Sequence, residues 1–413
     1  MVRLPHSLGL LRERDLSRYA AATAVSMFGN GMATVALAFA VLRLGGATDL
    51  GLVLLAREVP MVVLLLAGGV WADRLPRKLI LAGCDTVSAG AQAATALLLL
   101  TDNAGVAGIA ALQVVFGAAR AFSRPASTGL IQQIVAATHL QEANALVGLA
   151  RSLGRIAGPG IGGLVVTVAS PAWALAGDAA TFACSALLVA SLHVGTAARS
   201  HSQSMRADLR EGWREVRSRT WMWTIIVYFG LYQLTLFPTL LVLGPVVADD
   251  ELGGATAWGL ILAFQAVGSL AGGLLALRIR FERPLVATVV LAMLLPWLLY
   301  LLAVPAPLAL LLGFTLVASA CLTLDDAVWS ATLQRHIPER AISRVSSFDW
   351  LGSVALNPIG YLLVGPLSGS IGVSETLVLA ATVNTVAALI VLVLPAVRGL
   401  GAYPAELAAG SSR

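Results

Sequence analysis

The sequence predicts an all-α membrane protein with twelve transmembrane helices, arranged as two six-helix pseudo-repeats. Composition is the first reason, because 58% of the 413 residues are hydrophobic and 12% are charged. A soluble domain carries about twice that fraction of charged residues. The mean hydropathy is correspondingly high, at +0.85. The second reason is that the apolar residues form runs of membrane-spanning length, since a spanning helix needs roughly 20 apolar residues.

The predicted spans follow one another with short polar loops between most of them. We expect their ends to lie within several residues of the bounds given. The spans are 19–43, 50–71, 79–101, 105–131, 141–169, 172–193, 221–247, 254–277, 284–303, 305–332, 343–367 and 373–396.

The basic residues predict the orientation in the membrane. If both termini and the even-numbered loops share one side, nearly all loop Lys and Arg residues fall there, and only Arg43 falls on the other side. The acidic run at 249–251 also falls opposite the basic loops. Cytoplasmic loops carry such an excess of Lys and Arg. We therefore expect a multi-pass protein of the cell (plasma or inner) membrane with cytoplasmic termini. The net charge of +5 is a topology signal, not a sign of nucleic-acid binding.

An arginine-rich polar stretch divides the chain into two groups of six spans. We expect an N-terminal bundle at 1–194, a cytoplasmic linker at 195–220 and a C-terminal bundle at 221–413. The halves also share a pattern, because Gly68-Gly69 followed by Arg74 matches Gly272-Gly273 followed by Arg278. Transporters built from parallel repeats show internal similarity of this kind.

The loop between the second and third spans combines acidic and basic residues. Asp73 lies at a predicted helix end beside Arg74 and Arg77. An ion pair there could form in one conformation and break in another. Topology marking alone would explain the basic residues but not Asp73. The whole segment reads Gly69-Val70-Trp71-Ala72-Asp73-Arg74-Leu75-Pro76-Arg77-Lys78.

Glycine recurs every four residues in the predicted fifth span. Residues four apart share a helix face, so these glycines form one smooth ridge that permits close helix packing. Pro159 removes a backbone donor and bends the helix. Gly268 and Gly272 form a similar ridge in the eighth span, and we expect the two ridges to pack across the interface between the halves. The alternative is a purely structural small-residue contact. The fifth-span motif consists of Gly154, Arg155, Gly158, Pro159, Gly162 and Gly163.

These two motifs resemble signatures of the major facilitator superfamily. The fifth span is similar to the G-x-x-x-G-P-x-x-G-G motif of its proton-coupled drug antiporters. The stretches at 120–126, 144–155, 178–182 and 333–345 resemble the macrolide-efflux and enterobactin-exporter-like branch. The resemblance implies a latch that stabilises the outward-facing state, formed by Gly69, Asp73, Arg74, Arg77 and Lys78. Three positions depart from the pattern: Pro76 stands where the loop motif usually has glycine, Asn30 replaces a frequent aspartate, and Gln113 replaces a frequent arginine.

Several ionisable or amide side chains fall inside the predicted spans, where such groups are costly and usually functional. A carboxyl group in a low dielectric binds a proton more readily, as proton coupling requires. Fixed ion pairs that orient helices are the alternative. Asp325 and Asp326 are about 100° apart on a helix, so we expect only one to face a cavity. The candidates for coupling or substrate contact are Asn30, Arg57, Glu58, Gln113, Arg151, Arg155, Asp178, Tyr232, Gln233, Asp325, Asp326 and Asp349.

The resemblance implies a secondary active transporter that exports a small amphipathic molecule, such as a drug, an antibiotic or a siderophore-like compound, by proton antiport with alternating access. The alternatives are an importer or symporter of a small nutrient or siderophore, and a lipid flippase on the same fold. We do not expect an enzyme, because the five histidines fall in or beside predicted cytoplasmic loops without metal-ligand spacing. We expect no cofactor, no metal and no nucleic-acid partner. The expected partners are the small-molecule substrate, protons and the lipid bilayer, and the expected state is a monomer.

Overall fold

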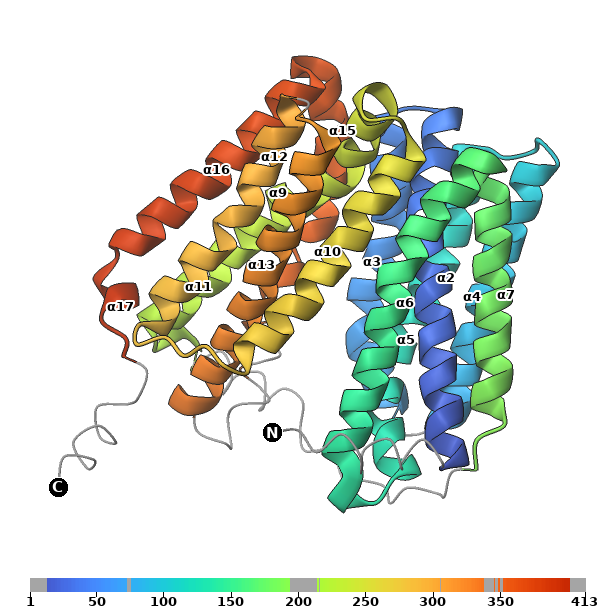
Figure 1. Cartoon of the computed structure of the whole chain (residues 1–413), viewed down its shortest axis with the longest axis horizontal. Coiled ribbons are helices and arrows are strands. Elements are labelled where there is room, and N and C mark those ends of the chain that lie inside the picture. Colours follow the sequence, from blue (N-terminus) through green and yellow to red (C-terminus); the bar gives the residue numbers. More distant parts are fainter. Residues whose placement is uncertain are drawn as a thin grey trace. The chain divides into compact units, whose positions relative to one another are not determined.

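The computed structural model describes residues 13–72, 76–193, 214, 216–304, 306–337, 345, 348–349 and 352–401. Within these ranges every regular element is a helix (Figure 1). Nine of the helices found there are long and apolar enough to cross a membrane. The predicted all-α membrane fold is thereby confirmed.

The first compact unit holds the first six long helices. They are α2 (Arg14–Leu44), α3 (Ala47–Ala72), α4 (Arg77–Leu100), α5 (Val106–Ile134), α6 (Leu140–Val168) and α7 (Pro171–Ala190), with a short 3-10 turn η2 (Ala137–His139) before α6. They correspond in order to the first six predicted spans. Helix α2 packs against α6 and α7, α3 packs against α5, and α4 packs against α5 and α7. The segment Ala248–Ala263 belongs to this unit as well.

The second compact unit is formed by the C-terminal helices. They are α9 (Thr220–Glu251) as far as Val247, α10 (Ala255–Ala276) from Phe264, α11 (Pro284–Ala292), α12 (Leu294–Ala303), α13 (Leu308–His336), α15 (Asn357–Ile371), α16 (Val373–Val393) and α17 (Pro395–Arg398). Helix α12 packs against α13 and α16. The predicted eleventh span corresponds to the segment Gly352–Ile371, which includes α15 and is long and apolar enough to cross a membrane. Most of the predicted linker, at 195–213, lies outside the described residues.

The predicted span 284–303 is interrupted at Met293, between α11 and α12. Pro296 has no backbone N–H and cannot donate to the carbonyl of Ala292, four residues earlier. The Tyr232 hydroxyl donates to that Ala292 carbonyl instead, at 3.3 Å. A side chain from α9 therefore satisfies the backbone group that the proline leaves without a partner.

Helix α4 carries a polar stripe on its buried side. Asp85, Ser88, Gln92 and Thr95 are all buried and recur every three or four residues, which places them on one face. The outward face is apolar, and Leu97 is 61% exposed. This arrangement reverses the pattern of a soluble helix, as expected where lipid surrounds the bundle. It gives the first unit a polar interior.

Candidate functional site

A chain of hydrogen bonds holds Asp178 of α7 in the interior of the first unit, where this side chain has no exposed surface. Asp178 Oδ2 accepts a hydrogen bond from Gln92 Nε2 of α4 at 2.6 Å. Gln92 Oε1 accepts one from Gln113 Nε2 of α5 at 3.3 Å. The Thr181 hydroxyl lies 3.4 Å from the other carboxyl oxygen of Asp178. The network joins three helices and satisfies a buried polar group.

The structure brings together two of the predicted site residues, Asn30 and Arg57. A terminal guanidinium nitrogen of Arg57 on α3 donates to Asn30 Oδ1 on α2 at 3.1 Å. The Arg57 guanidinium carbon also lies 4.5 Å from the ring centroid of Phe116, a cation–π distance. Asparagine therefore keeps a hydrogen bond to this cation but does not neutralise it, as an aspartate would.

An aromatic pair connects this arginine with a second one. Phe116 packs edge to face against Phe182, with 5.7 Å between the ring centroids. The guanidinium carbon of Arg120 lies 5.8 Å from the Phe182 centroid. The interior of the first unit thus holds two arginines in contact with aromatic rings, close to the Asp178 network.

Three residues of this interior are absent from the predicted site: Asp85, Gln92 and Arg120. Asp85 is 7% exposed, and its Oδ2 accepts a hydrogen bond from the Ser185 hydroxyl at 2.6 Å. Asp85 and Arg120 are charged residues inside apolar spans, and that signal alone identifies them. Gln92 carries no charge, and its role follows only from the packing of α4 against α7.

The glycine ridge of α6 packs against α2, inside the first unit. A Cβ added at Gly158 would collide with the backbone carbonyl oxygen of Phe28. The neighbouring helix presents a matching surface, because a Cβ at Gly31 would lie 2.7 Å from Pro159 Cδ. Gly154 and Gly162 approach the α2 backbone in the same way, near Ala24 and Met32.

The predicted packing of this ridge against Gly268 and Gly272 is wrong. A Cβ at either of those glycines would collide with a backbone carbonyl oxygen of α13, that of Leu316 or of Ala320. Each ridge therefore serves a close helix pair inside its own unit, α2 with α6 in the first and α10 with α13 in the second. In the first pair, glycines on both helices let the two backbones approach. Gly163 faces a different direction, toward the backbone of Ala255, which belongs to the first unit.

The carboxyl groups of the second unit have contrasting environments. Asp325 on α13 is 2% exposed, and within the described residues its Oδ1 has no hydrogen-bond partner. The adjacent Asp326 is exposed, so the two side chains point in different directions. Asp349 is half-buried, and its Oδ2 accepts a hydrogen bond from Trp329 Nε1 at 3.0 Å.

The remaining candidates occupy less distinctive positions. Tyr232 has no exposed surface and bonds to a backbone carbonyl, which favours a packing role over contact with a substrate. Gln233 and Glu58 are half-buried. In the loop motif, Lys78 Nζ donates to the carbonyl oxygen of Leu192 at 2.6 Å. Gly69 lies in α3 and Arg77 begins α4, whereas Asp73 and Arg74 lie outside the described residues.

Relatives of known type match almost the whole chain. The multidrug efflux pump Tap of Mycolicibacterium fortuitum is 28% identical over 397 residues, which cover 90% of this chain and 93% of that protein. The pump of the same name from Mycobacterium tuberculosis is 25% identical over 398 residues, with 93% and 94% covered.

Solved structures of transporters share the fold. The nucleoside transporter NupG superposes with a TM-score of 0.72 at 15% identity, covering 92% of this chain and 98% of that one. An inward-facing bacterial homologue of the iron transporter ferroportin gives a TM-score of 0.69 at 16% identity, with 92% and 99% covered. The family model of the Major Facilitator Superfamily matches residues 19–356. With most of its length matched by that model, and with an all-helical membrane fold, the chain belongs to the Major Facilitator Superfamily of membrane transporters.

Proposed function

We propose that this transporter exports small amphipathic molecules of the drug or antibiotic class from the cytoplasm, in exchange for protons that move inward. The observation that carries the proposal is the similarity to proteins named multidrug efflux pumps over nearly the full chain. The fifth-span motif supports the proposal as well. Its glycines and Pro159 lie on α6, and the motif resembles that of drug antiporters. The termini would lie in the cytoplasm of a cell-membrane protein, as the loop charges predict.

Alternating access would require the two bundles to expose a shared substrate path to each side of the membrane in turn. The close α2–α6 contact supports rigid-body movement of the first unit, because a pair of helices in backbone contact resists internal shear. The latch residues of the second-to-third loop would control this exchange, a role that comes from the family resemblance.

The proton carrier would be Asp325. A buried carboxylate without a cation beside it is unstable in a membrane interior, so such a group must either bind a proton or become exposed to water. Asp325 is buried, has one unpartnered oxygen, and forms no salt bridge with any described cation. Proton binding in one conformation and release in another would couple transport to the proton gradient.

Asp178 fits a different role. Both of its carboxyl oxygens have a donor beside them, since Oδ2 accepts a hydrogen bond from Gln92 and Oδ1 lies 3.4 Å from the Thr181 hydroxyl. A buried polar group whose hydrogen bonds are made is held in one orientation. Asp178 would therefore orient α4, α5 and α7, and the alternative proton carriers are Glu58, Asp178 and Asp349.

The proposal is tested by drug accumulation in cells. Cells that express the transporter should retain less of several structurally unrelated fluorescent amphipathic compounds than cells with an empty vector. A protonophore should abolish the difference, because it removes the proton gradient. Higher retention in expressing cells would indicate import, and a difference restricted to labelled lipids would indicate a flippase.

A further inference from the structure

A cavity of about 590 Å³ lies inside the first unit, among α2, α4, α5, α6 and α7. Its charged lining residues are Arg120, Arg151, Arg155 and Asp85. Three cations therefore share this space with one carboxylate. None of the three arginines forms a salt bridge within the described part of the chain.

The one carboxylate does not balance these charges. Asp85 Oδ2 already accepts a hydrogen bond from Ser185. Arg151 and Arg155 lie four residues apart on α6, a spacing at which like charges on a helix repel each other. Charged side chains inside a membrane protein are normally paired or face a water-filled cavity. Arg151 and Arg155 are exposed and form no salt bridge with a described carboxylate, so their guanidinium groups are available to bind an anion.

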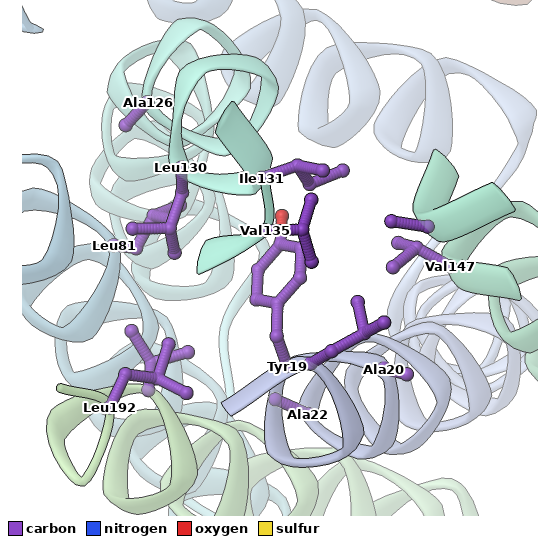
Figure 2. Packing of buried hydrophobic residues seen from close by; sticks show 13 residues of the cluster. Tyr19, Ala20, Ala22, Leu81, Ala126, Leu130, Ile131, Val135, Val147 and Leu192 are labelled. Carbon is purple, nitrogen blue, oxygen red and sulfur yellow. The ribbon is translucent and has the colours of Figure 1, made fainter. Parts of the chain in front are cut away.

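Apolar side chains also line the cavity. Tyr19, Leu81 and Ile131 line the cavity and belong to a buried apolar cluster of the same bundle. Figure 2 shows the Tyr19 side chain extending among Ile131, Val135 and the other residues of that cluster. The Tyr19 hydroxyl is fixed by a hydrogen bond to the backbone carbonyl of Ser127, at 3.3 Å. A cavity lined by both cationic and apolar side chains suits a ligand that has both an anionic and an apolar part.

We propose that this cavity binds the oxyanion group of a ligand, a carboxylate or a phosphate, with Arg120, Arg151 and Arg155 as its ligating residues. The planar guanidinium group binds both oxyanions through paired hydrogen bonds. The volume falls within the range of small-molecule sites, about 300–1,000 Å³. Such an oxyanion can belong to an acidic transported compound, to a lipid headgroup or to free phosphate. Anion binding at this site does not depend on proton coupling or on the direction of transport. A failure of the anion-site proposal is therefore distinguishable from a failure of the proposed drug export.

The test is direct binding to the purified full-length transporter in a neutral detergent. The probes are decanoate with decanol as its neutral partner, dioctanoyl phosphatidylglycerol with dioctanoyl phosphatidylcholine, and inorganic phosphate with chloride at equal ionic strength. We expect saturable binding, and a rise in Tm, for at least one oxyanion probe and not for its partner. Decanoate binding would indicate an acidic substrate, phosphatidylglycerol binding a lipid, and phosphate binding a free anion.

Variants that remove a positive charge and a variant that removes a negative charge make the test specific, because they should change binding in opposite directions. Arg151→Gln and Arg155→Gln should each weaken binding about tenfold or more, as expected for loss of a charge-assisted hydrogen bond. Both side chains are exposed, so these variants should fold even if Arg120→Gln does not. Asp85→Asn should tighten binding, because it removes the carboxylate that repels the anion. Arg280→Gln is the matched control, an exposed arginine of the second unit that does not line this cavity. The proposal is overturned if no oxyanion probe binds saturably, or if Arg280→Gln weakens binding as much as the cavity variants.

Discussion

Replacing Gly158 by alanine should abolish most transport, although it adds a single methyl group. The new Cβ would collide with the carbonyl oxygen of Phe28 on α2, a backbone atom that cannot rotate away. Overpacking of a tight contact costs about 1–3 kcal/mol. Helices α2 and α6 would have to separate, which would disturb the packing around both. The measurement is transport in vesicles, together with Tm of the purified protein.

Gly148→Ala is the matched control, because Gly148 lies on the same helix and an added Cβ there would meet no atom within 4 Å. Alanine is favoured over glycine in a helix by about 0.5–1 kcal/mol, so this variant should be neutral or slightly more stable. Equal tolerance of alanine at 148 and 158 would refute the account of a close α2–α6 contact that transport requires.

Asp325→Asn should eliminate transport driven by a pH gradient while preserving substrate exchange in the absence of a gradient. Asparagine has nearly the shape of protonated aspartate but cannot bind and release a proton. The variant should therefore still change conformation with substrate bound. Counterflow of labelled substrate measures exchange, and uptake into acid-loaded vesicles measures the driven process.

The adjacent Asp326 provides the control, since it is the same residue type, one position along α13, but exposed. Asp326→Asn should retain the response to the pH gradient. If Asp325→Asn retains a full response, Asp325 is not the carrier, and Glu58→Gln, Asp178→Asn and Asp349→Asn then identify it. If every one of these variants responds normally, transport is not coupled to protons.

Much of the fold could be predicted from the sequence, because a membrane imposes a simple rule on helix length and hydropathy. The first six predicted spans match α2 to α7 in order. Helix ends were less predictable, since α2 begins at Arg14 and α13 continues to His336, beyond the apolar runs. The interruption at Met293 could have been inferred from Pro296, but its compensation by Tyr232 depends on tertiary packing.

The contacts of the site residues could not be predicted from the sequence, for a physical reason. Hydropathy reveals that Asp178 and Asp325 are unusual, but it does not reveal their partners. The Gln92 hydrogen bond distinguishes the first from the second, and that bond depends on the rotation of α4 against α7. The glycine ridges show the same limit, because periodicity identifies a surface for close packing without identifying the helix that covers it.

Simultaneous measurement of substrate and proton movement in proteoliposomes tests the central claim most directly. Vesicles containing the purified transporter are loaded with an acidic buffer and a luminal pH dye, then diluted into neutral buffer with a fluorescent amphipathic substrate. The account predicts that substrate accumulates in the lumen while the luminal pH rises in proportion, and that a protonophore abolishes the accumulation. Accumulation without any change in luminal pH, or accumulation only when the lumen is alkaline, would contradict proton-driven export.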